Sequence, residues 1–239
     1  IKTKMKIAPV PFKNAAKQKT IFLPLFQKEA LGRGGLFSYL PEKTKKILNE
    51  FAKKEFSGEE GEVKSLWLPD EKQKIVFLGL GEKAKWNERK YPLWARRAVQ
   101  YAKKEKIESL AAPLSAGGEK DAEDTAKIFA ANAVMAAFEY TRYKTLPKEG
   151  WPKIKTIFAA VAKNNAAEIK TGLREGLVIG EEANYCRELA NTPGGDMTPR
   201  HLAEAARKAG RRAGFRVKIL DERAIKKLRM GGVLGVAKG

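Results

Sequence analysis

Residues 184–199, read as NYCRELANTPGGDMTP, decide how the rest of the chain is divided. Pro193 and the two glycines after it end the helical pattern that precedes them. Thr198 before Pro199 is a typical helix start, with the hydroxyl as N-cap and proline at the first helical position. The stretch therefore predicts one long helix, a tight turn and a second helix, at the junction of two parts of the chain.

The sequence before this turn predicts a single helix from residue 165 to residue 190. Gly176 and Gly180 each cost about 1 kcal/mol of helix propensity relative to alanine, so we expect them where another backbone comes close. About 26 residues would span roughly 39 Å, long enough to link two domains. Small and apolar residues recur every three or four positions and share one helical face: Ala166, Ile169, Leu173, Leu177, Gly180, Ala183, Cys186 and Ala190.

Residues 1–163 alternate between strand and helix patterns, which predicts one α/β domain. Strands separated by whole helices require crossover connections, so the sheet should be mostly parallel with helices on both faces. Early strand pairs without a helix between them indicate a mixed edge. Strands are expected at 2–10, 20–26, 63–68, 74–80, 107–114 and 154–162, and helices at 41–56, 88–106 and 121–143.

Residues 192–239 predict the beginning of a second α/β domain. A helix should run to Ala213, with Gly214 placed to end it. A strand at 215–220, a short helix at 222–230 and the start of another strand at 232–236 should follow. The predicted divisions are therefore 1–163, a linking helix at 164–191, and 192–239. Because the chain begins with Ile1 and stops within an apolar, glycine-rich segment, we expect it to be part of a longer polypeptide.

The composition is that of a globular protein with a strongly basic charge. Of 239 residues, 43% are hydrophobic, which is enough for a core. The 48 Lys and Arg against 28 Asp and Glu give a formal net charge of +20. Such a field attracts anionic partners, nucleic acid among them, without selecting one. A lysine-rich solvated surface explains the same numbers.

Cys186 is the only cysteine, which excludes an internal disulfide and favours a reducing compartment. Its place on the inner stripe of the long helix predicts a buried, unreactive side chain, since a nucleophilic cysteine needs a base and an electropositive opening. We find no run of about 18 apolar residues and no charged-then-apolar leader, so we expect neither a membrane span nor a signal peptide. A cytoplasmic location is the resulting expectation.

Glycine-rich turns at 32–35 and 79–81 follow strands, where backbone amides can bind phosphate. Neither turn fits a phosphate-loop or dinucleotide fingerprint, so ordinary turns are the preferred interpretation. His201 is the only histidine and is expected at the surface, because one imidazole cannot make a histidine-based metal site. Asp121, Glu123 and Asp124 are best explained as acids at a helix N-terminus.

One surface is a candidate for binding an anionic partner: the basic patch of Arg207, Lys208, Arg211 and Arg212. The spacing places the four cations on one face of a helix. Contact with a phosphate backbone fits such a face, and a solvated amphipathic surface is the favoured alternative. No catalytic or metal-binding residue is predicted from the residues themselves.

Residues 172–239 resemble the leucyl aminopeptidase family over nearly their whole length. The matching motifs are EGLVIGEEAN, RELANTP, DMTPRHLAEAA, VKILDE and LRMGGVLGV, and weaker ones, VFLGLGEK and YTRYKT, extend the resemblance over most of the chain. One departure is Gly195, where the family commonly has Asn.

The resemblance implies a macro-domain-like N-terminal domain followed by a catalytic domain with two divalent metals, Zn or Mn. In the family a lysine and several carboxylates hold the metals, an arginine lies near a bicarbonate, and metal-bound water attacks the N-terminal peptide bond of peptides. Family members are typically homohexamers. The metal-binding segments lie downstream of VLGVAKG, and Lys238 is not the metal lysine. We therefore expect no metal, no metal ligand and no activity in these 239 residues alone.

Two functions from different classes follow. The first is the N-terminal portion of a two-metal leucyl aminopeptidase, with a structural and oligomer-supporting role. The second is a basic nucleic-acid-binding or regulatory module, since some family members double as DNA-binding proteins and this chain is very basic. A third, ligand binding in a macro-like cleft, has only fold analogy behind it.

Overall fold

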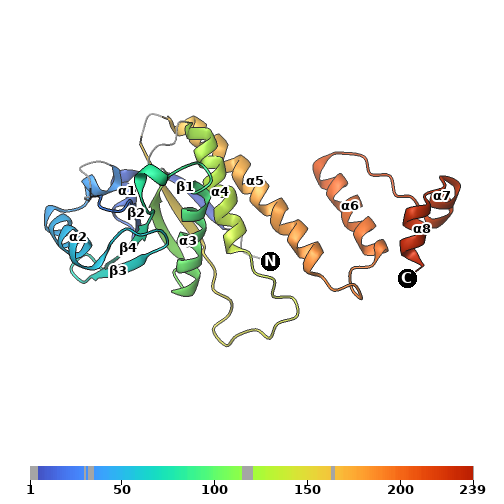
Figure 1. Ribbon diagram of the computed structural model, residues 1–239, viewed down its shortest axis with the longest axis horizontal. Helices are drawn as coiled ribbons and strands as arrows, with labels where there is room; N and C mark the ends of the chain where they lie inside the picture. The colour runs from blue at the N-terminus through green and yellow to red at the C-terminus, as the bar shows by residue number, and fades with distance from the viewer. Residues whose placement is uncertain (1–4, 30, 32–34, 115–120, 163–164, 239) are drawn as a thin grey trace. The chain divides into compact units, whose positions relative to one another are not determined.

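The computed structural model describes residues 5–29, 31, 35–114, 121–162 and 165–238 (Figure 1). The chain divides into two compact units, Ile1–Tyr185 and Cys186–Gly239, which are described separately below. The division falls inside a long helix, α5 (Ala166–Asn191), and not at either end of it. Our own boundaries, after residues 163 and 191, stay a prediction.

A six-stranded sheet forms the centre of the first unit. Its spatial order is β1-β6-β5-β2-β4-β3, and all neighbouring strands are parallel except β3 and β4. A mostly parallel sheet with one antiparallel edge is the predicted fold class, which is thereby confirmed. The strands are β1 (Lys6–Pro11), β2 (Thr20–Leu25), β3 (Val63–Leu68), β4 (Gln73–Gly79), β5 (Ser109–Pro113) and β6 (Thr156–Val161).

Helices cover both faces of this sheet, because successive side chains of a strand point to opposite sides. Phe22 of β2 joins a core with side chains of α3, α4 and α5, whereas its neighbour Ile21 joins a second core with Leu48 of α2. Figure 1 shows α3 and α4 together at the sheet. The helical elements are α1 (Phe12–Ala15), η1 (Gly35–Tyr39), α2 (Glu42–Glu55), η2 (Lys83–Lys85), α3 (Tyr91–Lys104) and α4 (Ala122–Ala137).

The helix predicted to run to residue 143 ends earlier, at Ala137. Phe138 has extended backbone angles, and the chain then forms a long loop before β6. Residues 138–143, FEYTRY, are rich in aromatic side chains, which lose rotamer freedom in a helix. Contacts outside the helix hold the loop instead: Glu139 pairs with Lys103 at 3.4 Å. This ion pair ties the start of the loop to α3.

Glycines bring α5 and α4 to backbone contact, as the glycine spacing predicts. A Cβ placed on Gly172 would lie 2.0 Å from the carbonyl oxygen of Glu123, and one on Gly176 would lie 2.2 Å from that of Lys127. One on Gly180 would also meet α4, at 2.7 Å from a side-chain carbon. No other residue fits these three positions without moving a backbone.

The second unit holds the end of α5 together with α6 (Pro199–Ala213), α7 (Glu222–Lys227) and α8 (Gly231–Ala237). Helix α6 begins and ends as predicted: the Thr198 side chain accepts a hydrogen bond from the N–H of His201, and Gly214 ends the helix with φ of 77°. None of the described large apolar side chains of this unit is buried. Those more than a third exposed are Leu202, Phe215, Ile219, Leu228, Met230, Val233 and Val236.

Three expectations for this unit were wrong. Residues 215–220 form no strand, because a strand needs a hydrogen-bonded neighbour and the described residues offer none there. Residues 232–236 lie in helix α8, which closes its backbone hydrogen bonds locally. Cys186 is exposed, because the face of α5 that packs on α4 ends near Asn184, whose side chain donates to the carbonyl of Val134.

The glycine packing gives a direct test. A methyl group at Gly176 would push α5 from α4, so we expect Gly176→Ala to lower the free energy of unfolding of the first unit by about 1–3 kcal/mol. The gain in helix propensity, about 1 kcal/mol, opposes this loss. Urea denaturation followed by circular dichroism measures the difference. The control, Arg174→Ala at an exposed position of α5, should stay within about 0.5 kcal/mol of wild type. A Gly176→Ala variant as stable as wild type would contradict the packing.

Candidate functional site

The predicted basic patch lies on the last turns of α6. Arg207, Lys208, Arg211 and Arg212 are all exposed, as a surface for an anionic partner requires. Part of their charge is compensated within the helix, because Glu204 pairs with Arg207 at 2.8 Å and with Arg211 at 3.4 Å.

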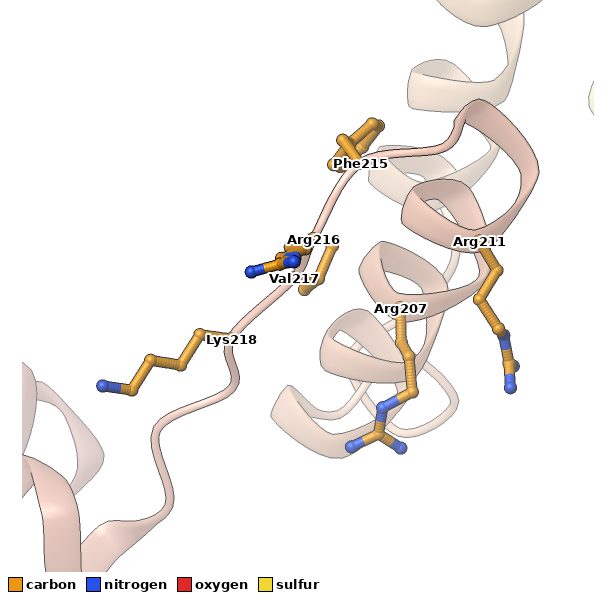
Figure 2. A pocket seen from close by; sticks show the side chains of 6 residues that line it. All are labelled: Arg207, Arg211, Phe215, Arg216, Val217 and Lys218. Atoms are coloured by element: carbon orange, nitrogen blue, oxygen red, sulfur yellow. The ribbon is translucent and has the colours of Figure 1, made fainter.

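A groove of about 550 Å³ lies between α6 and the segment that follows it (Figure 2). Two of the four patch residues, Arg207 and Arg211, line it, and Lys208 and Arg212 do not. Sequence reasoning missed the other four of the six lining residues, although the alternation of apolar and basic residues in FRVK is a signal that could have found them. These further lining residues are Phe215, Arg216, Val217 and Lys218.

The cationic groups around this groove do not converge on one point. Figure 2 shows Arg216 and Lys218 pointing away from α6, whereas Arg207 and Arg211 leave the helix in a different direction. A single bound anion needs several donors directed at the same place. The groove is therefore a space between a helix and an extended segment with cations at its edges, and not a cradle for one phosphate.

Gly210 sets how closely that segment approaches α6. A Cβ on Gly210 would lie 2.5 Å from Cγ2 of Val217 and 2.8 Å from the carbonyl oxygen of Phe215. The N–H of Phe215 donates to the carbonyl of Gly210 at 3.0 Å. Val217 therefore faces α6, and glycine is required at position 210, where the segment packs on the helix.

The space beside the glycine-rich turn at 79–81 is occupied by another loop of the protein. A Cβ on Gly79 would lie 1.9 Å from the carbonyl oxygen of Glu59, and the N–H of Gly81 donates to the carbonyl of Gly58 at 2.9 Å. The loop at 57–62 thus occupies the space that a phosphate would need, in agreement with an ordinary turn. Of the turn predicted at 32–35, only Gly35 lies within the described residues.

Glu62 holds this loop in place. Its Oε2 accepts hydrogen bonds from the N–H of Ser57 at 2.9 Å, the hydroxyl of Ser57 at 2.7 Å and the N–H of Gly58 at 2.9 Å. Partial burial acts to raise the pKa of Glu62, but the hydrogen bonds to its ionised form outweigh burial. The pKa of Glu62 is therefore lower than usual.

The remaining sequence candidates have local roles. His201 is exposed in the first turn of α6, with Nδ1 3.0 Å from the hydroxyl of Thr198. Asp121 caps α4 by accepting from the N–H of Asp124 at 2.7 Å, and Glu123 lies in the same first turn. These positions match the predicted surface and helix-terminus roles.

Residues 5–29, 31, 35–114, 121–162 and 165–238 contain neither a metal-ligand cluster nor a membrane-spanning helix. Among those residues, no three His, Cys, Asp or Glu side chains come together as a group able to hold a metal ion. They therefore do not fit a centre built from several carboxylates. No described helix combines the length and the apolar character needed to cross a membrane.

Comparison with family models matches both parts of the chain. Residues 22–147 match the model described as cytosol aminopeptidase family, N-terminal domain. Residues 184–239 match the catalytic domain of the same family. The two matches follow each other in the order of the two units.

Individual relatives agree with these matches. A probable cytosol aminopeptidase of Bordetella petrii is 32% identical over 172 residues, which cover 70% of this chain and 34% of the relative. The chain thus spans about a third of the length of the curated relatives it matches.

Two solved structures share the fold. A tomato leucine aminopeptidase mutant superposes with a TM-score of 0.78 at 21% identity, over 95% of this chain and 46% of that chain. The bottromycin maturation enzyme BotP in complex with Mn gives a TM-score of 0.62 at 19% identity, over 82% and 37%.

The bonds of Glu62 predict a pH-dependent effect on stability. Because its pKa is lower in the folded state, the stabilisation is present above the unfolded pKa of about 4.3 and is lost as the pH falls through the folded value. We expect Glu62→Gln to lower the free energy of unfolding by about 1–2 kcal/mol near neutral pH. Below about pH 4 the difference from wild type should shrink. Denaturation series at several pH values test this, with the exposed Glu59→Gln as control. A difference that does not change with pH would contradict the role of the carboxylate.

Proposed function

Because this chain belongs to the cytosol aminopeptidase family, we propose that it supplies the N-terminal domain and the beginning of the catalytic domain of an enzyme that removes N-terminal amino acids from peptides. One observation carries the proposal: the N-terminal match at 22–147 is followed by the catalytic match at 184–239. The activity belongs to the whole protein, of which these residues are one part.

The first unit has a structural role in this proposal. It has a sheet with cores on both faces, and its glycines at 172, 176 and 180 hold α5 against α4. Helix α5 then continues into the second unit, so the first unit sets where that helix starts and which way it leaves α4. We propose the divisions 1–163, 164–191 and 192–239 for this arrangement. We also propose a cytoplasmic homohexamer as the form of the whole protein, on the resemblance alone.

Two divalent metal ions, Zn or Mn, are proposed for the whole enzyme. The support is the resemblance, together with the structural similarity to BotP, which was solved in complex with Mn. The described residues offer no suitable group of ligands. On the resemblance, we place the ligands in the remainder of the catalytic domain and assign no chemical step to residues of this chain.

An activity assay compares the 239-residue chain with a polypeptide that contains the whole catalytic domain. The 239-residue chain, given leucine p-nitroanilide with Mn or Zn, should release no nitroaniline above the blank. The same residues followed by the remaining catalytic domain of the Bordetella petrii relative should release it, and the intact relative is the positive control. Turnover by the short chain would contradict our placement of the metal ligands. A folded, metal-loaded but inactive longer polypeptide would contradict the proposed function.

A second candidate function, nucleic-acid binding, is favoured by the net charge of +20 and the exposed basic patch on α6. If the patch contacts phosphates, affinity for duplex DNA should fall steeply with salt, with a log–log slope of about 0.9 per phosphate contact. Replacing Arg207, Lys208, Arg211 and Arg212 by Ala should reduce that slope.

The matched control removes the same charge elsewhere: Lys46, Lys53, Lys54 and Lys64, all exposed, replaced by Ala. Fluorescence anisotropy at several salt concentrations gives the slopes. A smaller slope only in the patch variant supports the patch as the binding surface. Equal changes in both variants, or binding that does not respond to salt, would contradict it.

A further inference from the structure

The sheet of the first unit has two outer strands, β1 and β3, each with a neighbour on one side only among the described residues. On β1, the N–H of Lys6 donates to the carbonyl of Lys155, beside β6, at 2.9 Å. Because a strand turns alternate N–H groups to opposite sides, positions 9 and 11 of β1 face the open side. Both are prolines, which have no N–H. The open edge of β1 is therefore a poor template for a further strand.

Strand β3 has no such block, and Figure 1 shows it as the outer strand beside β4. The carbonyl of Glu62 accepts from the N–H of Gly79 at 2.8 Å, so the backbone groups of residue 62 point to β4. The antiparallel register continues without a break to the end of β3, so the backbone groups of Val63, Ser65 and Trp67 point to the open side. Among the described strands, β3 pairs with β4 alone. Its outward N–H and C=O groups can bind a further strand.

Side chains on both faces of this edge are positioned to contact an added strand. Trp67 is 56% exposed, and its cross-strand partner is Lys74, whose Nζ pairs with Glu105 at 2.8 Å. Successive side chains alternate between the two faces of the sheet. On the opposite face, the half-buried Leu66 packs against the core that includes residues of α2. A further strand would cover the Trp67 ring on one face and Leu66 on the other.

The charges of the β3–β4 hairpin favour an acidic partner. Both of its acids are engaged by side chains of α2, at 2.7 Å for Asp70 and 2.6 Å for Glu71. Lys64 and Lys72 are exposed, and neither pairs with an acid of the described chain. A second copy would bring the same lysines and the same formal charge of +20, so like charges oppose pairing between copies. An acidic strand meets no such opposition.

We propose that the open edge of β3 binds an extended acidic segment of another protein, which adds to the sheet as a further strand. Backbone hydrogen bonds to residues 63, 65 and 67 supply the pairing. Lys64 and Lys72 attract the carboxylates, and Trp67 packs against an apolar side chain of the segment. The proposal does not depend on the proposed function, because it uses only residues of the first unit.

Fluorescence anisotropy with a fluorescein-labelled peptide of five Glu-Val repeats tests the binding. The control is the same peptide with every backbone N–H methylated, which has the same charge and cannot donate to the edge. We expect the unmethylated peptide to bind the 239-residue chain about tenfold more tightly or better, since it alone can form the hydrogen bonds. Equal binding of the two peptides would show attraction by net charge alone and overturn the proposal, as would no binding of either.

A proline variant gives β3 the same block that β1 has. Because the N–H of Ser65 points outward, Ser65→Pro keeps the pairing with β4 and should weaken binding of the peptide about fivefold or more. Ser65→Thr keeps the N–H and should bind like wild type, and circular dichroism checks that both variants fold. Lys64→Glu should also weaken binding, most strongly at low salt. If Ser65→Pro does not fold, Lys64→Glu and the methylated peptide still decide. Wild-type affinity in the folded variants would place the peptide elsewhere and overturn the proposal.

The polypeptide extended with the remaining catalytic domain of the Bordetella petrii relative shows whether the edge stays open in the longer protein. It should bind the peptide with the same affinity, and hydrogen exchange of the amides at 63–68 should slow when the peptide is added. Loss of binding would show that the catalytic domain covers the edge. Dimers in sedimentation, with these amides protected without peptide, would assign the edge to a second copy. Either result overturns the proposal, and the aminopeptidase activity of the same polypeptide tests the proposed function separately.

Discussion

The close backbone contact between α4 and α5 fixes the position of α5, the last helix of the first unit. At Gly172 and Gly176, the space that a Cβ would need is taken by carbonyl oxygens of the facing helix. Such contact leaves α5 little freedom to slide or to turn, because any larger side chain would force the helices apart. At the far end of this contact, the side-chain amide of Asn184 donates a hydrogen bond to the carbonyl of Val134 in α4. The helix that leads to the second unit is thus set by packing inside the first.

The two units differ in how their stability arises. In the first, strands far apart in sequence pair with one another and bury large side chains such as Phe22, Phe77 and Trp94. In the second, the described elements are helices whose hydrogen bonds close within a few residues. Helices form from local bonds, whereas strands require a distant partner. This difference explains why the helices of the second unit are present while its apolar side chains stay exposed.

Part of the positive charge is compensated by ion pairs within the described chain. Several acids of the first unit are paired with cations: Glu60 contacts Lys90 and Arg97, and Glu105 contacts Lys74. On α6, Glu204 forms ion pairs with two of the four patch cations, Arg207 and Arg211. The net charge of +20 adds a long-range field, which is weakened by salt.

Local patterns determined much of this protein before any coordinates. Apolar runs located the strands of the first unit, Thr198 with Pro199 located the start of α6, and the helical glycines indicated the close approach that α4 provides. The family resemblance was also contained in short motifs. All of these depend on residues a few positions apart, whose preferences act within one element.

Only the tertiary structure decided which faces have partners. It placed Cys186 in solvent because α4 ends before reaching it. It filled the turn at Gly79 with the loop that Glu62 holds, and it directed Arg207 and Lys218 away from a common point. It also left residues 216–220 without a backbone hydrogen bond to another backbone group of the described chain. Each of these outcomes depends on contacts with residues that are distant in the sequence. Local periodicity does not reveal such contacts.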